Sequence, residues 1–387
     1  MLIWGAVLIS VVVNVLLYVY FKEKTAWWEY CILVPATLAF VLVAKVGLSS
    51  IVMRDSETWG GFVTQATYKE PYDENTPHQN CTTDSKGNNH CTTYYTCDGY
   101  SASIYLTDSN GIDIGISADE FEDLAKKFDD RHKIGKRGDG CGKVGPVWET
   151  DWNDKDETLA SVFTKHSYKN PVKASSGSLF KFKKIDKSLI KQYGLFDYPK
   201  YEWNSEPFVM GDAPGRGDAN KRVAFYNGKY GRVKERIIWI LVFRNQPIDA
   251  AFAQQSYWQN GNKNELVVCV GVDQAFKTQW AYVFSWAENE KMKLEIADMI
   301  LAEKDKLLDT PAVADKVHQL SLGAWKRKHF KEFNYLSAAI PWWGTALVYF
   351  LTLALNAGLG YIVIFNTYDA DGKSGYNGRR WNTGRRW

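Results

Sequence analysis

The stretch "IIWILVFRNQPIDAAFAQQSYWQNGNKNELVVCVGVD", residues 237–273, carries the clearest pattern in the chain and predicts its fold class. Ile237 to Phe243 is a continuous apolar run, which is typical of a strand buried on both faces of a sheet. Pro247 then favours the start of a helix, predicted over Ile248 to Trp258. Leu266 to Val272 is a second apolar run, so we expect two buried strands joined by a helix.

Amide side chains separate the predicted helix from the second strand. Asn260-Gly261 is typical of a left-handed helix stop, and Asn262 and Asn264 are expected to brace the junction rather than to react. For an enzyme, the candidate carboxylates are Asp249 at the start of the helix and Asp273 at the end of the strand.

The residues that follow continue the layered pattern. Gln279 to Trp286 alternates in polarity and predicts a strand beside the second apolar run. One face of this strand is a candidate binding surface, with packing against a helix as the alternative; it carries Trp280, Tyr282 and Trp286. Helices are expected over Glu288 to Leu308 and Ala312 to Phe330, which together predict a small α/β domain over residues 232–331.

These elements also carry a family resemblance. The strand "IIWILVF" is followed by Ala253 and Trp258 on the helix, then by Gly261 and Asn264, "LVVCVGVD" and "TQWAYVFSW". In this order, over about residues 237–295, they resemble the TPM-domain family. The resemblance implies a membrane-tethered α/β module, and acid-phosphatase activity, metal binding and assembly roles occur in that family. The family's acidic pair after the central strand corresponds here to Asp273-Gln274.

A broader resemblance covers the plan of the chain. The stretches "WGGFVTQATY" and "WKRKHFKEFNYL", with an H-x-x-C at His78 and Cys81, resemble membrane proteins of bacteria and tailed phages. The resemblance implies an architecture only. A phage-encoded envelope-modifying or exclusion factor is a separate alternative for the function.

Three apolar segments predict three transmembrane helices, because each approaches the roughly 20 apolar residues that a bilayer core requires. They are Leu2 to Tyr20, Trp28 to Ala44 and Leu336 to Phe365. The first two are expected to form an uncleaved helical hairpin within residues 1–53, and the third lies within residues 332–366. The fold class is therefore a membrane-anchored α+β protein.

The polar block between the second and third apolar segments holds two further regions. Residues 54–130 are expected to form a β-rich, cysteine-containing subdomain, with a hairpin around the turn at 108–111. Ser117 and Glu120 form a capping box for a short helix. Residues 131–231 are rich in Lys, Asp, Gly and Pro, and are expected to be an irregular, loop-rich connection.

Four cysteines lie in this polar block, and their spacing leaves two interpretations open. As disulfides, Cys81, Cys91, Cys97 and Cys141 would place the domain outside the cytoplasm, although the sequence does not choose their pairing. As a zinc site, the alternative ligands are His78, Cys81, His90, Cys91 and Cys97, but no standard spacing is present. We expect disulfides and an extracytoplasmic domain, with a cytoplasmic domain as the alternative.

Basic residues flank the last apolar segment on both sides. In the tail, residues 367–387, the repeated GRRW predicts contact with anionic lipid headgroups through Arg379, Arg380, Arg385 and Arg386. The cluster Lys326 to Lys331 is expected to reach the membrane surface in the same way. We expect no nucleic-acid partner.

The net charge of +3 gives no single-sign field, and the chain lacks a G-x-S-x-G elbow, an H-E-x-x-H motif and a phosphate-binding loop. We therefore predict a non-catalytic, extracytoplasmic module that binds or assembles an unknown protein of the cell envelope, without a cofactor. The alternative is a TPM-like phosphatase or metal-dependent hydrolase.

Overall fold

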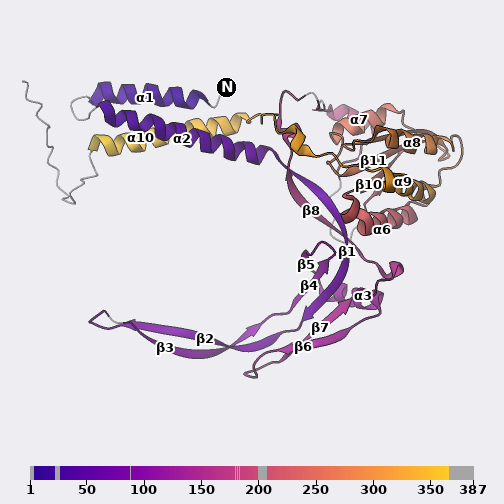
Figure 1. Ribbon diagram of the computed structural model, residues 1–387, viewed down its shortest axis with the longest axis horizontal. Helices are drawn as coiled ribbons and strands as arrows, with labels where there is room; N and C mark the ends of the chain where they lie inside the picture. The colour runs from indigo at the N-terminus through magenta and orange to yellow at the C-terminus, as the bar shows by residue number, and fades with distance from the viewer. Residues whose placement is uncertain are drawn as a thin grey trace, which may run out of the picture. The chain divides into compact units, whose positions relative to one another are not determined.

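The structure is a computed structural model that describes residues 4–21, 27–87, 89–178, 180, 182, 184–198 and 207–365. It is a mixed α and β fold in two compact units. The first unit comprises residues 1–54, 169–179 and 333–387, and the second comprises residues 55–168 and 180–332. Figure 1 labels the helices and strands of both units.

Three apolar helices pack on one another in the first unit (Figure 1). They are α1 (Gly5–Phe21), α2 (Trp27–Val52) and α10 (Trp342–Phe365). The same unit also contains the short helix α4 (Pro171–Ala174). Among the described residues, two stretches are long and apolar enough to cross a membrane, Leu33–Val52 and Trp342–Ile362. The helix α1 is apolar but shorter, so its crossing stays a prediction.

The interior of this helical unit is polar at its centre. The Asn356 Oδ1 atom accepts hydrogen bonds from Ser10 Oγ at 2.8 Å and Asn14 Nδ2 at 2.9 Å. The Asn356 amide also donates to Thr37 Oγ1 at 3.2 Å. All four side chains are buried, whereas large apolar residues are exposed around them, such as Leu8, Val12, Leu16, Val43 and Leu353. This distribution is the reverse of a water-soluble helical bundle.

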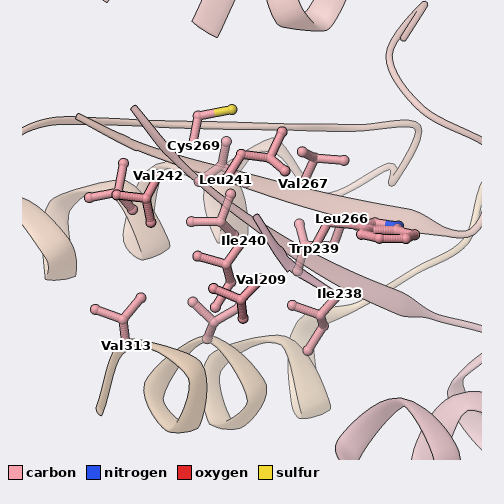
Figure 2. Packing of buried hydrophobic residues seen from close by; sticks show 14 of the residues in the cluster. Val209, Ile238, Trp239, Ile240, Leu241, Val242, Leu266, Val267, Cys269 and Val313 are labelled. Atoms are coloured by element: carbon pink, nitrogen blue, oxygen red, sulfur yellow. The ribbon is translucent and has the colours of Figure 1, made fainter. Parts of the chain in front are cut away.

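The second unit contains a four-stranded sheet in the order β12-β11-β10-β9. Its strands are β9 (Val209–Met210), β10 (Ile237–Arg244), β11 (Glu265–Val272) and β12 (Thr278–Ser285). The strands β10 and β11 run parallel and are joined by α7 (Asp249–Tyr257), while β12 pairs antiparallel to β11. The two buried strands and their connecting helix are therefore confirmed. In Figure 2, Val313 and Cys269 lie on opposite sides of the central strands, so side chains pack on both faces.

Helices α5 (Lys187–Tyr193), α6 (Arg216–Lys234), α8 (Glu290–Leu301) and α9 (Thr310–Ala324) complete this layer, followed by a 3₁₀ turn, Phe330–Phe333. The helix α8 ends earlier than predicted because the chain after Leu301 pairs with the start of β12. Thr278 N donates to Lys306 O at 2.9 Å, and Leu308 N donates to Phe276 O at 2.9 Å. The helix α9 likewise ends at Ala324 rather than near Phe330.

A six-stranded sheet forms the other part of the second unit, in the order β5-β4-β1-β7-β6 with β8 paired to β1. Its strands are β1 (Arg54–Lys69), β4 (Ser103–Asp108), β5 (Asp113–Gly115), β6 (His132–Arg137), β7 (Gly145–Asp151) and β8 (Ser161–Lys169). The predicted hairpin is the β4–β5 pair. The predicted capping box begins α3 (Ala118–Phe128), whose apolar face packs on the sheet.

The prediction of an irregular region over residues 131–231 is wrong, because β6, β7, β8 and α6 lie there. Every residue of β6 is exposed, so this edge strand has no apolar alternation to detect. The helix α6 contains glycines that allow close packing. A Cβ atom at Gly231 would lie 2.9 Å from the Cα atom of Gly60, so α6 meets β1 where both lack a side chain.

Candidate functional site

The turn between α7 and β11 has the structural role that the sequence predicts. Gln259, Asn260 and Gly261 all have left-handed backbones, with φ of 53°, 68° and 76°. The Asn260 amide donates to Ser285 O at 2.8 Å, and the Asn264 amide donates to Thr58 O at 2.6 Å. The turn therefore joins α7 to β12 and β1 through buried amide groups.

The two candidate carboxylates have separate local roles. Asp273 Oδ1 accepts hydrogen bonds from Ala275 N at 2.9 Å and Lys277 N at 2.8 Å, which closes the turn between β11 and β12. Asp249 lies in the first turn of α7, where a negative charge stabilises the helix. Catalysis by these residues stays a prediction.

The aromatic face of β12 packs inside its own unit. Trp280 Nε1 donates to Gln246 O at 2.8 Å, and Trp286 Nε1 donates to Gly261 O at 3.2 Å. Tyr282 donates to Gln255 Oε1 at 2.7 Å, and its ring contacts Phe252 edge-on. All three polar groups are satisfied internally, which agrees with the packing alternative for this face.

The four cysteines of the polar block form two disulfides, Cys81–Cys91 and Cys97–Cys141. Their sulfur atoms are therefore not available as thiolate ligands, and the zinc alternative with His78 and His90 is not formed. His78 Nε2 lies 2.7 Å from Thr96 Oγ1 instead. His90 Nε2 lies 3.4 Å from the Asp84 carboxylate.

Three of these cysteines, Cys81, Cys91 and Cys97, lie in a long two-stranded ribbon, which we name the β2–β3 arm (residues 72–100). The strands β2 (Tyr72–Thr83) and β3 (Asn89–Tyr100) pair along their whole length, 12 residues each (Figure 1). Among the described residues of the arm, Tyr72 is buried and every other side chain is exposed or half-buried. The arm has no hydrophobic core of its own.

The base of the arm is fastened along the outer edge of β2. Asp73 N donates to Lys143 O at 2.8 Å, and Lys143 N donates to the Asp73 carboxylate at 2.6 Å. Asn75 N donates to Asp139 Oδ2 at 2.9 Å. The Cys97–Cys141 disulfide crosslinks the same loop to β3. The outer edge of β2 is therefore covered near the base.

Farther along β2, the position of Pro77 shows which backbone groups face the two outer edges of the arm. Pro77 pairs with Tyr95 and has no N–H, so its backbone nitrogen faces the outer edge of β2. The outward direction alternates along a strand, and the outward donors of Asp73 and Asn75 follow the same alternation. On β3, the residues whose N–H and C=O groups face outward are Cys91, Thr93, Tyr95 and Cys97. Within the described chain, this sheet has no third strand.

We name residues 91–97, "CTTYYTC", the β3 edge. It contains no charged residue, no proline and no glycine. Tyr94 and Tyr95 are 52% and 67% exposed. Edge strands are normally protected by lysine, proline or a covering element. The β3 edge contains neither residue, and no strand of the described chain covers it. It is an open template for another strand.

Three residues of the cationic cluster at 326–331 form ion pairs within the domain. Arg327 donates to the buried carboxylate of Glu57 and pairs with Glu235 at 2.6 Å. Lys326 lies 2.6 Å from Glu288, and Lys328 lies 3.6 Å from Glu332. Contact of this cluster with a membrane surface stays a prediction. The tail arginines Arg379, Arg380, Arg385 and Arg386 lie outside the described residues.

A cleft of about 740 Å³ lies between α3, residues 156–163 and α6. Its walls carry charges of both signs, including Lys127, Lys221, Arg222, Asp123, Asp156 and Glu157. Arg222 and Tyr226 both donate to Asp315. Burial first, and then the bond to Asp315, raise the pKa of Tyr226 to about 12, against the opposing charge of Arg222. The balanced charges favour neither an anionic nor a cationic ligand.

No family model, no curated protein and no solved structure matches this chain. The resemblance to the TPM-domain family stays a prediction, and the function is argued from the geometry.

Proposed function

We propose that the chain is a membrane-anchored, extracytoplasmic assembly module that joins a second copy of itself by strand addition along the β3 edge. The observation that carries this proposal is the open, uncharged β3 edge on an arm crosslinked by two disulfides. In strand addition, backbone hydrogen bonds supply affinity and the side chains supply specificity.

The helical unit supports the membrane anchor. Its polar side chains meet at the centre and its apolar side chains face outward, an arrangement that costs free energy in water and none in hydrocarbon. Disulfides persist in oxidising compartments, which supports an extracytoplasmic location for the second unit.

The arm itself favours a binding role. An isolated two-stranded ribbon is at best marginally stable in water, and this one lacks a core. Two disulfides offset that cost by restricting the unfolded chain, one of them across 44 residues. Because the arm contributes little to the hydrophobic core, we infer that its role is to present a binding surface.

A second copy fits the β3 edge because the edge is self-complementary. Antiparallel pairing centred on Tyr94 places Thr93 opposite Tyr95 of the other copy, so outward N–H groups meet outward C=O groups. The segment is uncharged, so two copies do not repel each other. Threonine and aromatic cross-strand pairs each contribute roughly 0.2–1 kcal/mol.

The test compares proline on opposite edges of one rung, where Gln79 pairs with Thr93. Thr93→Pro removes an outward N–H from the β3 edge, whereas Gln79→Pro removes one from the β2 edge. Purified in detergent, the full chain and Gln79→Pro should be dimeric, and Thr93→Pro should be monomeric, by light scattering after size-exclusion chromatography. Intact mass without reductant checks that both disulfides persist. A monomeric parent chain, or a dimeric Thr93→Pro, would overturn the proposal.

The location is tested by counting thiols in unreduced membranes. The chain has six cysteines, and denaturation with a maleimide should label Cys269 but none of Cys81, Cys91, Cys97 and Cys141. Labelling of all six would place the second unit in a reducing compartment and contradict the extracytoplasmic assignment.

A further inference from the structure

A histidine lies among carboxylates where the strands β6 and β7 meet the end of α3. His132 Nδ1 is 3.2 Å from the Asp130 carboxylate. His132 Nε2 is 3.5 Å from Glu149 Oε1 and 3.9 Å from Asp151 Oδ2. One ligand atom from each of Asp130, His132 and Asp151 lies within 4.8 Å of the others.

Strand geometry explains why these residues converge. His132 and Glu149 are direct partners in the antiparallel β6–β7 ladder. Asp151 lies two residues beyond Glu149 on β7, so the period of two places both carboxyl groups on the face that carries His132. Asp130 lies before β6, in the segment that follows α3. The carboxyl groups are thus supplied to one imidazole from β7 and from the segment before β6.

The backbone around this cluster is held in place by hydrogen bonds. Asp130 N donates to Ala125 O at 3.1 Å, at the end of α3. Asp151 N donates to Asp130 Oδ2 at 2.8 Å, and the Asn153 amide donates to Phe128 O at 2.9 Å. A ligand at the cluster would therefore meet side chains on an ordered scaffold.

The charge of the cluster is strongly unbalanced. Three carboxylates surround one imidazole, and the neighbouring cation Arg131 is directed elsewhere, to Glu122 at 2.8 Å and over the Trp148 ring. Like charges this close repel one another. A bound divalent cation would remove that repulsion.

The geometry points to a divalent transition-metal site formed by Asp130, His132 and Asp151, with Glu149 as an additional carboxylate. The imidazole selects the class of metal, because Mg²⁺ and Ca²⁺ prefer oxygen ligands alone, whereas Zn²⁺ and similar ions bind mixed nitrogen and oxygen sets. The site is independent of the β3 edge and would stabilise the turn from α3 into β6.

The experiment titrates the full chain, purified in detergent and freed of metal, with Zn²⁺ and separately with Ca²⁺. We expect one Zn²⁺ per chain to be lost in His132→Ala, and Glu149→Gln to weaken binding by about 10- to 100-fold. Zn²⁺ should also raise the thermal midpoint of the parent chain but not that of His132→Ala.

His78→Ala is the matched control, because His78 also lies 3.5 Å from a carboxylate, that of Asp98, at a similar exposure. Its Zn²⁺ binding should equal that of the parent chain. Unchanged affinity in His132→Ala, equal loss in His78→Ala, or Ca²⁺ binding more tightly than Zn²⁺ would each overturn the assignment.

Discussion

Arg327 donates two hydrogen bonds, of 2.9 and 2.7 Å, to the carboxylate of Glu57, a side chain that is only 3% exposed. The two residues are separated by 270 positions in the chain. The same carboxylate accepts from Trp59 Nε1 at 3.0 Å and lies 3.3 Å from Lys263 Nζ. Glu57 therefore ties the start of β1 to the residues after α9 and to the α7–β11 turn.

Removing one partner of this pair should destabilise the second unit strongly. Arg327→Ala leaves Glu57 buried without its main cation, and breaking a buried pair in this way costs roughly 3–5 kcal/mol. Chemical denaturation of the full chain measures the change. The control is Lys326→Ala, whose pair with Glu288 is exposed to solvent, and it should have no resolvable effect. Equal midpoints for the two variants would contradict the structural role of Glu57.

The glycine in β11 should not tolerate a methyl group. Gly271 pairs with Trp280 across the sheet, and a Cβ atom at Gly271 would overlap the indole ring. Gly271→Ala should therefore cost roughly 1–3 kcal/mol through overpacking. Gly115→Ala in β5 is the control, because a Cβ atom there meets nothing within 4 Å. Thermal midpoints of both variants check this, and an unchanged midpoint for Gly271→Ala would count against the packing.

Acid should destabilise the fold through His318. Burial, and after it the nearby Arg236 charge, lower the pKa of His318 from its ordinary 6.5 to about 4, against the opposing effect of Asp315. The Arg236 guanidinium lies 3.0 Å from His318 Nδ1, and the imidazole stacks on Tyr226 at 3.9 Å. A guanidinium at this distance repels a protonated imidazole, so the contact with Arg236 favours the neutral ring.

Because the folded pKa lies below the unfolded value, the stabilisation by neutral His318 is complete above pH 6.5. It is lost as pH falls from 6.5 to about 4, by up to roughly 3 kcal/mol. His318→Gln keeps an acceptor and does not titrate, so its midpoint should fall less between pH 7.5 and 4.5. Parallel curves for the two proteins would contradict this assignment.

The polar centre of the helical unit should hold its three helices together. Asn356→Leu removes the bonds to Ser10, Asn14 and Thr37, and interhelical hydrogen bonds in membranes contribute about 0.6–2 kcal/mol. Unfolding of the full chain in SDS, followed by tryptophan fluorescence, should shift to lower SDS. Leu353→Ala, at an exposed apolar position, should shift it less. The opposite ranking would indicate that packing, not the polar centre, joins the helices.

Elements that depend on local chemistry were predictable from the sequence. The runs Ile237 to Phe243 and Leu266 to Val272 predict buried strands because both faces of each strand are covered. The capping box at Ser117 and Glu120 acts within one helical turn. The left-handed stop at Asn260-Gly261 likewise depends on the backbone preferences of those residues alone.

The tertiary structure decided what depends on pairing between distant residues. The strand β6 is exposed on both faces, so its sequence shows no alternation of polar and apolar residues. Its register with β7, which forms the cluster around His132, therefore could not be predicted. Cysteine spacing allows three pairings, and the arm selects one by placing Cys81 opposite Cys91. In the sequence, Arg327 is one of a cluster of basic residues before an apolar segment. Only the folded structure shows that it binds the carboxylate of Glu57. The spacing of apolar residues in the sequence predicts which strands are buried. The partners of polar and exposed residues depend on contacts between distant parts of the chain, which only the folded structure brings together.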